Sequence, residues 1–308
     1  MGSFKRLACR GPAVVFLWFA AWSNQTRAQV CCSATSAISP GRLALHERGL
    51  SGIQPGATGV LGTFDQRSSF LASAPDSHQV DFTMSPFATV RVARRVQWGA
   101  MVPILASSRA SNDSAEFGGG VGDVSTTVRY DPMYNGEYRH WPGLGLVLGA
   151  VIPTGRPPEE STHALGSDVT GLGVFQFNGG IWLERSFGAW LVSAAGLMSL
   201  RTAREVDGIK SQLAPHFTVL LAVGYSFSEE IAVALSTSLF LEANVRVNGE
   251  SVPDTARYKL HGTLALSYSP SDTFRLQASA GIDPPLDGWG RNELSTAGGA
   301  LTLIRSFR

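Results

Sequence analysis

The chain has 308 residues, of which 34 are glycine, and its 25 Lys and Arg residues nearly balance its 24 Asp and Glu residues, giving a formal net charge of +1. This balance gives no electrostatic basis for binding nucleic acid or for polybasic attachment to a membrane surface. Charged residues make up only 16% of the chain, against about 25% in ordinary soluble proteins, so much of the surface is expected to face something other than water.

The N-terminus has the order of a secretory signal peptide. Lys5 and Arg6 precede an apolar run over residues 13–22, and a short polar stretch follows and ends at Ala28. The apolar run is shorter than the roughly 20 residues of a membrane-spanning helix, and a small residue such as Ala28 suits a cleavage site. A buried N-terminal helix is the alternative. We predict a leader over residues 1–28 and export of the rest.

Residues 29–56 precede the first clear strand pattern and contain the adjacent Cys31 and Cys32. These cysteines could bond to each other, bond to another chain, or be lipidated. The segment is predicted as a periplasmic tail in preference to a small plug that tucks into the barrel. His46 and Glu47 are too few ligands for a metal site, and no metal or cofactor is predicted.

Alternation with a period of two residues dominates the rest of the chain. Between residues 217 and 227 the odd positions are Phe, Val, Leu, Val, Tyr and Phe, while the even positions are mostly small or polar. Such a pattern is typical of a strand with one apolar face. After the leader no apolar run is long enough for a membrane helix, and lipid tolerates a sheet only when it is closed. The predicted fold is all-β, an antiparallel up-and-down transmembrane β-barrel over residues 57–308, with a soluble lipocalin-like or sandwich fold as the alternative.

The alternation predicts about twelve strands, each able to supply the roughly 9 to 11 residues of a spanning strand. They are expected near residues 57–70, 80–93, 95–107, 119–131, 142–153, 170–184, 188–200, 213–227, 230–246, 257–269, 272–283 and 295–307. Short turns alternate with long polar loops, as in bacterial outer-membrane barrels, and an even strand count leaves both ends in the periplasm. This predicts the outer membrane of a Gram-negative bacterium, with membrane lipid and the assembly machinery as partners, although Arg305 and Arg308 depart from the usual C-terminal assembly signal.

Aromatic residues gather at the strand ends on the short-turn side, where an interfacial girdle would lie. They are Trp98, Phe187, Trp190, Tyr225, Phe227, Tyr268 and Phe307.

The motif Gly122-Asp123-Val124-Ser125, followed by the glycine-rich run of residues 143–155 that ends in Pro-Thr-Gly, resembles a family of bacterial outer-membrane transporters annotated by analogy with phenol-degradation (meta-pathway) proteins. The resemblance covers roughly residues 119–190. It implies a barrel that passes small, apolar compounds.

Charged side chains on the inward face are the candidate lumen lining. They are Asp81, Arg91, Asp123, Arg129, Glu184, Glu242, Lys259, His261 and Arg275. One hypothesis is that the four cations form a stripe that favours anionic solutes. The other is that they pair with the acids and fill a structural barrel.

The predicted function is an outer-membrane channel or transporter for passive passage of small solutes, apolar or anionic and of unknown identity. The alternatives are a structural or adhesive barrel with a plugged lumen and, less favoured, a barrel that hydrolyses lipid. No Gly-x-Ser-x-Gly elbow or phosphate-binding loop occurs, and the histidines are scattered. The chain is therefore not predicted to be an enzyme, and no catalytic residue is proposed.

Overall fold

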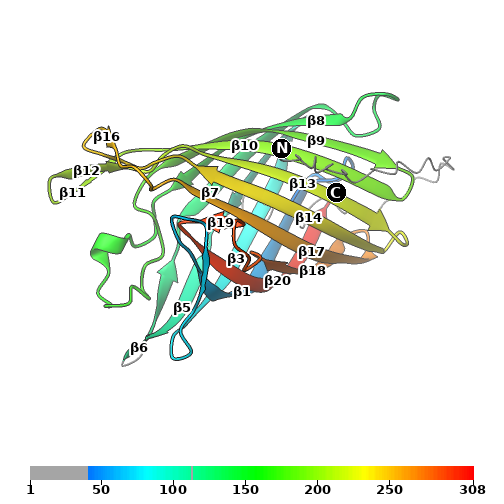
Figure 1. Cartoon of the computed structure of the whole chain (residues 1–308). Coiled ribbons are helices and arrows are strands. Elements are labelled where there is room, and N and C mark those ends of the chain that lie inside the picture. Colours follow the sequence, from blue (N-terminus) through cyan, green and yellow to red (C-terminus); the bar gives the residue numbers. More distant parts are fainter. Residues whose placement is uncertain (1–40, 112–113) are drawn as a thin grey trace, which may run out of the picture.

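The chain folds as a closed antiparallel barrel of 12 strands in a computed structural model that describes residues 41–111 and 114–308 (Figure 1). The predicted leader and the pair Cys31 and Cys32 lie outside the described residues. The described part contains no helix that is long and apolar enough to cross a membrane. It contains one short 3-10 helix, Pro158–Glu160.

Ten of the twelve wall strands are unbroken. They are β1 (Gly49–Phe64), β3 (His78–Ala93), β8 (Gly143–Ile152), β9 (Gln176–Phe187), β10 (Trp190–Arg201), β13 (His216–Ser226), β14 (Ile231–Glu242), β17 (Arg257–Ser271), β18 (Phe274–Ile282) and β20 (Glu293–Phe307). The other two are each interrupted, one between β4 (Val96–Met101) and β5 (Ile104–Ser111), the other between β6 (Ser114–Val121) and β7 (Val124–Met133).

The barrel is closed by its first strand. β1 pairs with β20 from Gly49, which lies opposite Phe307, and with β3, where Gly49 lies opposite Val90. Both chain ends of the wall therefore lie at the end of the barrel that carries the short turns. The even strand count and the all-β fold confirm the sequence prediction.

The burial pattern follows the alternation of the sequence. On β3 the side chains of Ser85, Phe87 and Thr89 point inward and are buried, whereas Phe82 and Val90 point outward and are 47% and 41% exposed. Outward apolar side chains are expected where a wall faces lipid, since the lumen of such a barrel is the polar side. The predicted girdle residues Trp190 and Phe227 are likewise exposed at the short-turn end.

Strand boundaries differ from the prediction by four to eight residues in several places: β1 ends at Phe64 and not near 70, β6 begins at Ser114 and not near 119, β5 runs to Ser111, and β14 ends at Glu242. The two largest shifts at a strand start are those of β1 and β9. β1 begins at Gly49 and not near residue 57, because Gly49–Gly56 pairs with neighbours on both sides although its Gly- and Pro-rich sequence hides the alternation. β9 begins at Gln176 and not near residue 170, because residues 170–175 belong to the preceding loop.

Two segments predicted as long loops form a small sheet of their own. β11 (Arg204–Val206) and β12 (Ile209–Gln212) pair with β15 (Arg246–Val247) and β16 (Glu250–Ser251), and the sheet projects from the long-loop end (Figure 1). Two further short strands, β2 (Phe70–Ala72) and β19 (Gly290–Arg291), lengthen the wall at that end. We call the four-stranded sheet the flap.

A compact apolar cluster lies inside the barrel beneath the closing strand. Leu50 and Ile304 are each 2% exposed, and they pack with Phe87 and with Leu43, which precedes β1. The cluster joins β1, β3, β20 and the N-terminal segment at one point.

Replacing Leu50 by Ala should therefore lower the free energy of unfolding by about 2 to 4 kcal/mol, because it leaves a cavity in this cluster. Leu45 is 66% exposed, and Leu45→Ala should cost less than about 1 kcal/mol. Denaturant unfolding of the refolded protein, followed by tryptophan fluorescence, measures both. Equal losses would show that the cluster does not secure the closure.

Candidate functional site

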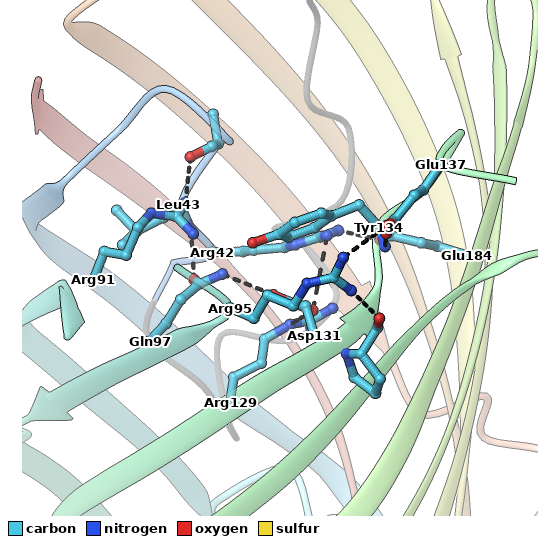
Figure 2. Close-up of polar contacts among 12 residues, drawn as sticks. Arg42, Leu43, Arg91, Arg95, Gln97, Arg129, Asp131, Tyr134, Glu137 and Glu184 are labelled. Atoms are coloured by element: carbon cyan, nitrogen blue, oxygen red, sulfur yellow. Dashed lines mark hydrogen bonds and ion pairs between the residues drawn. The ribbon is translucent and has the colours of Figure 1, made fainter. Parts of the chain in front are cut away.

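Residues 41–48 cross the mouth of the barrel at its short-turn end (Figure 2). Leu43 and Glu47 are 3% and 2% exposed. The backbone N–H of Leu43 donates to Oε1 of Gln97 at 3.0 Å, and that of Ala44 donates to Oε2 of Glu47 at 2.6 Å. The segment that the sequence favoured as a periplasmic tail thus lies inside the barrel in its described part. We call residues 41–48 the mouth segment.

Ion pairs attach the mouth segment to distant parts of the wall. Arg42 pairs with Glu184 of β9, and Glu47 pairs with Arg275 of β18. Glu184, Glu47 and Arg275 are each less than a tenth exposed, so breaking either pair would take a charged partner away from a buried group. Such a loss commonly costs about 3 to 5 kcal/mol.

Arg91 holds the backbone of the same segment. Its guanidinium donates to the carbonyl oxygens of Ala44 at 2.6 Å and of Glu47 at 3.0 Å. Because two guanidinium nitrogens bind two carbonyls, the segment is fixed in position as well as in charge.

Asp131 of β7 is the centre of the polar network below the mouth segment. It is 1% exposed, accepts from Nε of Arg129 at 2.7 Å and from Nε2 of Gln97 at 2.9 Å, and lies 4.0 Å from Arg42. The guanidinium of Arg129 also lies 5.8 Å from the ring centroid of Trp182. Figure 2 shows these side chains converging from several strands on the mouth segment.

A second contact group lies at the outer rim of this mouth. Glu137, in the link between β7 and β8, accepts from the backbone N–H of Tyr134 at 2.9 Å and from Arg95 at 2.6 Å. These two hydrogen bonds, with that from Tyr134 the stronger effect, lower the pKa of Glu137. The carboxylate of Glu137 therefore stays charged in mildly acidic solution, and its hydrogen bonds with Tyr134 and Arg95 persist there.

A second charged layer lies toward the long-loop end of the lumen. Glu242 is 4% exposed and pairs with Arg201 at 3.0 Å and with Arg257 at 2.7 Å. Asp283 is 1% exposed and pairs with Lys259 at 3.3 Å and with Nδ1 of His261 at 2.7 Å. Arg257 also lies 3.1 Å from Glu293, so the three Lys and Arg side chains of this layer lie among three carboxylates.

Uncharged side chains, most of them small, lie between the two charged layers. The buried inward-facing members of this middle belt include Thr127, Ala195, Leu197, Leu220, Ser236, Ala265 and Thr302, and Trp182, opposite Ala195, packs with Ala195 and Leu220. The belt gives a solute no fixed charge to bind midway along the lumen.

The structure separates the predicted lumen residues into groups. Arg91, Arg129, Glu184 and Arg275 gather around the mouth segment, while Glu242, Lys259 and His261 lie in the layer near the long loops. The remaining two predicted residues, Asp81 and Asp123, have their hydrogen-bond partners outside these two groups. Asp81 accepts from Ser107 at 2.5 Å, and Asp123 accepts from the backbone N–H groups of Gly155 and Leu172, each at 2.9 Å.

Several important residues were not predicted from the sequence. Asp131 shares the inward face of its strand with Arg129 and could have been found by continuing the alternation. Arg42 and Glu47 lie outside any strand, so no periodic signal marks them. Among the described residues, no group of three or more His, Cys, Asp and Glu could hold a metal ion.

These features define the class of fold: a closed 12-strand barrel of the outer-membrane type, with a charged and partly filled lumen. No protein-family model matches the sequence and no curated protein matches it, so the resemblance to the phenol-pathway family stays a prediction. Similar folds occur among solved structures. The crystal structure of the COG4313 outer membrane channel from Pseudomonas putida F1 has a TM-score of 0.70 at 13% identity, covering 88% of this chain and 100% of that chain. The β-domain of the Bordetella autotransporter BrkA has a TM-score of 0.50 at 11% identity, covering 85% and 100%.

If the ion pairs hold the mouth segment in place, breaking them should make its buried residues more accessible to a reagent in solution. With Cys31 and Cys32 replaced by Ser, a cysteine at Ala44, which is 6% exposed, should react slowly with a charged thiol reagent. Adding Glu47→Gln should raise the rate about tenfold or more, because it removes the charge that Arg275 binds. Arg48→Gln, at an exposed position of the same segment, is the control and should leave the rate unchanged. Equal rates in all three proteins would contradict the role given to the Glu47 pair.

Proposed function

We propose that the protein is an outer-membrane channel for the passive passage of small solutes, with a periplasmic mouth that the mouth segment closes. The short-turn end is assigned to the periplasm, and the protein to the Gram-negative outer membrane, because long loops of such barrels face outward. The similar fold of a solved outer-membrane channel supports this proposal. Membrane lipid and the assembly machinery belong to the same proposal as partners.

The observation that carries the proposal is the middle belt. Barrels of about eight strands are filled by their own side chains, whereas those of about 16 leave an open channel. A barrel of 12 strands whose middle carries mostly Thr, Ser and Ala beside Leu197, Leu220 and Trp182 has more room than one lined by large residues throughout. A barrel with a purely structural role has no need of such a lining.

The arrangement of charge favours uncharged or weakly polar solutes over anions. Of the four cations in the stripe hypothesis, Arg91, Arg129 and Arg275 lie at the periplasmic mouth and Lys259 lies in the other layer. Each contacts an acceptor: carbonyl oxygens for Arg91, Asp131 for Arg129, Glu47 for Arg275 and Asp283 for Lys259. The three cations that lie against a carboxylate contribute little field to an open pore, and Arg91, whose partners are uncharged carbonyl oxygens, is the exception.

Planar-bilayer conductance of the protein that lacks residues 1–28 tests the channel. The unmodified protein should be mostly closed. Arg42→Ala combined with Glu47→Gln should raise the open probability about tenfold or more, a ratio equivalent to about 1.4 kcal/mol. His46→Ala, at an exposed position between the two anchors, is the matched control and should behave like the unmodified protein.

The same recordings test the alternative of a structural barrel with a plugged lumen, which the buried mouth segment favours. If the double variant and a protein lacking residues 29–48 are both folded and both silent, the channel proposal is wrong. Folding is checked by the slower electrophoretic band that appears when the sample is heated in detergent.

Ion selectivity follows from the matched charges. In a salt gradient the open double variant should show a reversal potential near zero, since most of the lumen charges lie in local pairs of opposite sign. A strong anion preference that disappears when Arg91, Arg129, Lys259 and Arg275 are replaced by neutral residues would instead support the hypothesis of a cationic stripe.

A further inference from the structure

Two strands of the wall carry the same outward-facing row of side chains at their short-turn ends. On β9 the row is Leu183, Arg185 and Phe187, and on β20 it is Leu303, Arg305 and Phe307. The two Leu side chains are each 40% exposed, and the two Phe side chains are 53% and 47% exposed. The residues between Leu and Arg, Glu184 and Ile304, are buried on the inward side, so alternation places both rows on the lipid-facing surface. We call them the outer rows.

The Arg of each outer row lies on the hydrocarbon side of the aromatic girdle. Phe187 and Phe307 both belong to the predicted girdle, and Phe187 lies opposite Trp190, whose ring is 4.8 Å from that of Tyr225. The Arg comes two residues before the Phe, which is about 6 to 7 Å nearer the middle of the wall along the strand. A charged side chain at such a level costs less when its head reaches back to the membrane boundary.

Both guanidinium groups do reach back toward the end of the strand. The guanidinium carbon of Arg185 lies 5.1 Å from the ring centroid of Phe187, and that of Arg305 lies 5.8 Å from the ring centroid of Phe307. Arg185 also donates to the carbonyl oxygens of His140 at 3.0 Å and of Arg139 at 3.1 Å, in the link between β7 and β8. The charged heads therefore lie at the level of the girdle, where the lipid head groups begin.

These two cations have no counter-ion on the protein. Among the described residues, no carboxylate oxygen lies within 4.0 Å of a nitrogen of Arg185 or Arg305. Glu137 and Asp272, acids of the same end of the barrel, pair with Arg95 and Arg308. A guanidinium at a lipid boundary without a carboxylate is suited to a phosphate oxygen pair, which its planar fork binds in a bidentate manner.

We propose that each outer row binds one phospholipid of the membrane, with the guanidinium on the phosphate, the Leu side chain against an acyl chain and the Phe ring at the membrane boundary. This inference rests on the membrane placement given under the proposed function, and it does not require an open lumen. It gives a role to Arg305, whose charge departs from the usual C-terminal assembly signal.

Native mass spectrometry of the detergent-solubilised protein tests the two sites. The probe is dioleoyl phosphatidylglycerol, because the phosphate carries the only charge of its head group. The unmodified protein should retain two phospholipids tightly. Arg185→Gln and Arg305→Gln should each retain one, and the double variant should bind phosphatidylglycerol about tenfold or more weakly at both sites. Arg67→Gln combined with Arg246→Gln, exposed positions of the long-loop end, removes the same charge and should retain both lipids.

Two competing ligands separate the phosphate from its possible sources. Dioleoylglycerol has the same acyl chains without phosphate, and the unmodified protein and the double variant should bind it equally weakly. If the double variant loses both lipids to the same extent, the rows recognise acyl chains and the phosphate contact is wrong. Millimolar inorganic phosphate should not displace phosphatidylglycerol, and displacement would mean that the Arg side chains bind a free anion and not a lipid.

The single variants keep the test decisive if the double variant does not fold. Arg185→Gln also removes the hydrogen bonds to the β7–β8 link, whereas Arg305→Gln breaks no side-chain hydrogen bond of the described structure. Arg305→Gln alone should lose one of the two phospholipids, and Arg305→Lys, which keeps the charge but not the planar fork, should bind with intermediate strength. Unchanged retention of both phospholipids in Arg305→Gln would overturn the proposal.

Failure of the lipid sites is distinguishable from failure of the proposed function. A folded barrel that binds neither phosphatidylglycerol nor dioleoylglycerol refutes the membrane placement itself, whereas equal phospholipid binding by all the variants refutes only the outer rows. Placed in the Arg42→Ala, Glu47→Gln background, the Arg185→Gln, Arg305→Gln pair should leave the bilayer conductance unchanged. Loss of conductance together with lipid would mean that the two Arg residues support the barrel itself, and the separate lipid sites would then be wrong.

Discussion

The structure depends on one constraint: hydrocarbon offers no partner to a backbone N–H or C=O group, so every strand of a spanning wall needs a neighbour on both sides. The long register of β1 with β20 and β3 meets this requirement where the chain ends come together. Once the wall is closed, successive side chains of each strand point alternately to the lipid and to the lumen. β6 pairs only with β5, and on its other side the loop residues Leu165 and Thr170 hydrogen-bond to Glu116 and Val121 in place of a strand.

Charged side chains in the lumen have local partners of opposite charge, just as backbone N–H and C=O groups in the wall have partners on neighbouring strands. Asp131, Glu184 and Glu242 are each less than a tenth exposed and each has a cationic partner. Pairing of this kind adds little net stability, since the groups lose their hydration, but removal of one partner is costly. Such pairs hold the mouth segment in one position. Its ion pairs lie inside the lumen, apart from the strand pairing of β1 with β20 and β3 that closes the wall.

Much of this could be predicted from the sequence where a strand alternates cleanly. Residues 217–227 show the clearest period of two, and β13 occupies His216–Ser226 with Phe217 and Leu221 outward. Prediction failed where the alternation is hidden or the partner is remote. Residues 49–56 carry Gly and Pro, so the start of β1 was placed too late. The mouth segment depends on contacts such as Glu47 with Arg275, which are 228 positions apart, and no local pattern reports them. The interruptions of two wall strands fall at Pro103 and at Gly122-Asp123. Proline and glycine disrupt strands, but the alternation continues on either side and hides the break.

The charged side chains at the two ends of the lumen hold different things in place. At the short-turn end Arg42, Glu47 and Arg91 bind the mouth segment, which crosses the lumen. At the long-loop end the ion pairs of Glu242 and Asp283 join side chains of the wall strands or of residues next to them. Removal of a partner at the short-turn end therefore weakens the attachment of chain that lies in the lumen, whereas removal of a partner at the long-loop end weakens contacts within the wall. Under the proposed channel function, a change in charge pairing alters the opening of the lumen at the mouth segment and not at the long loops.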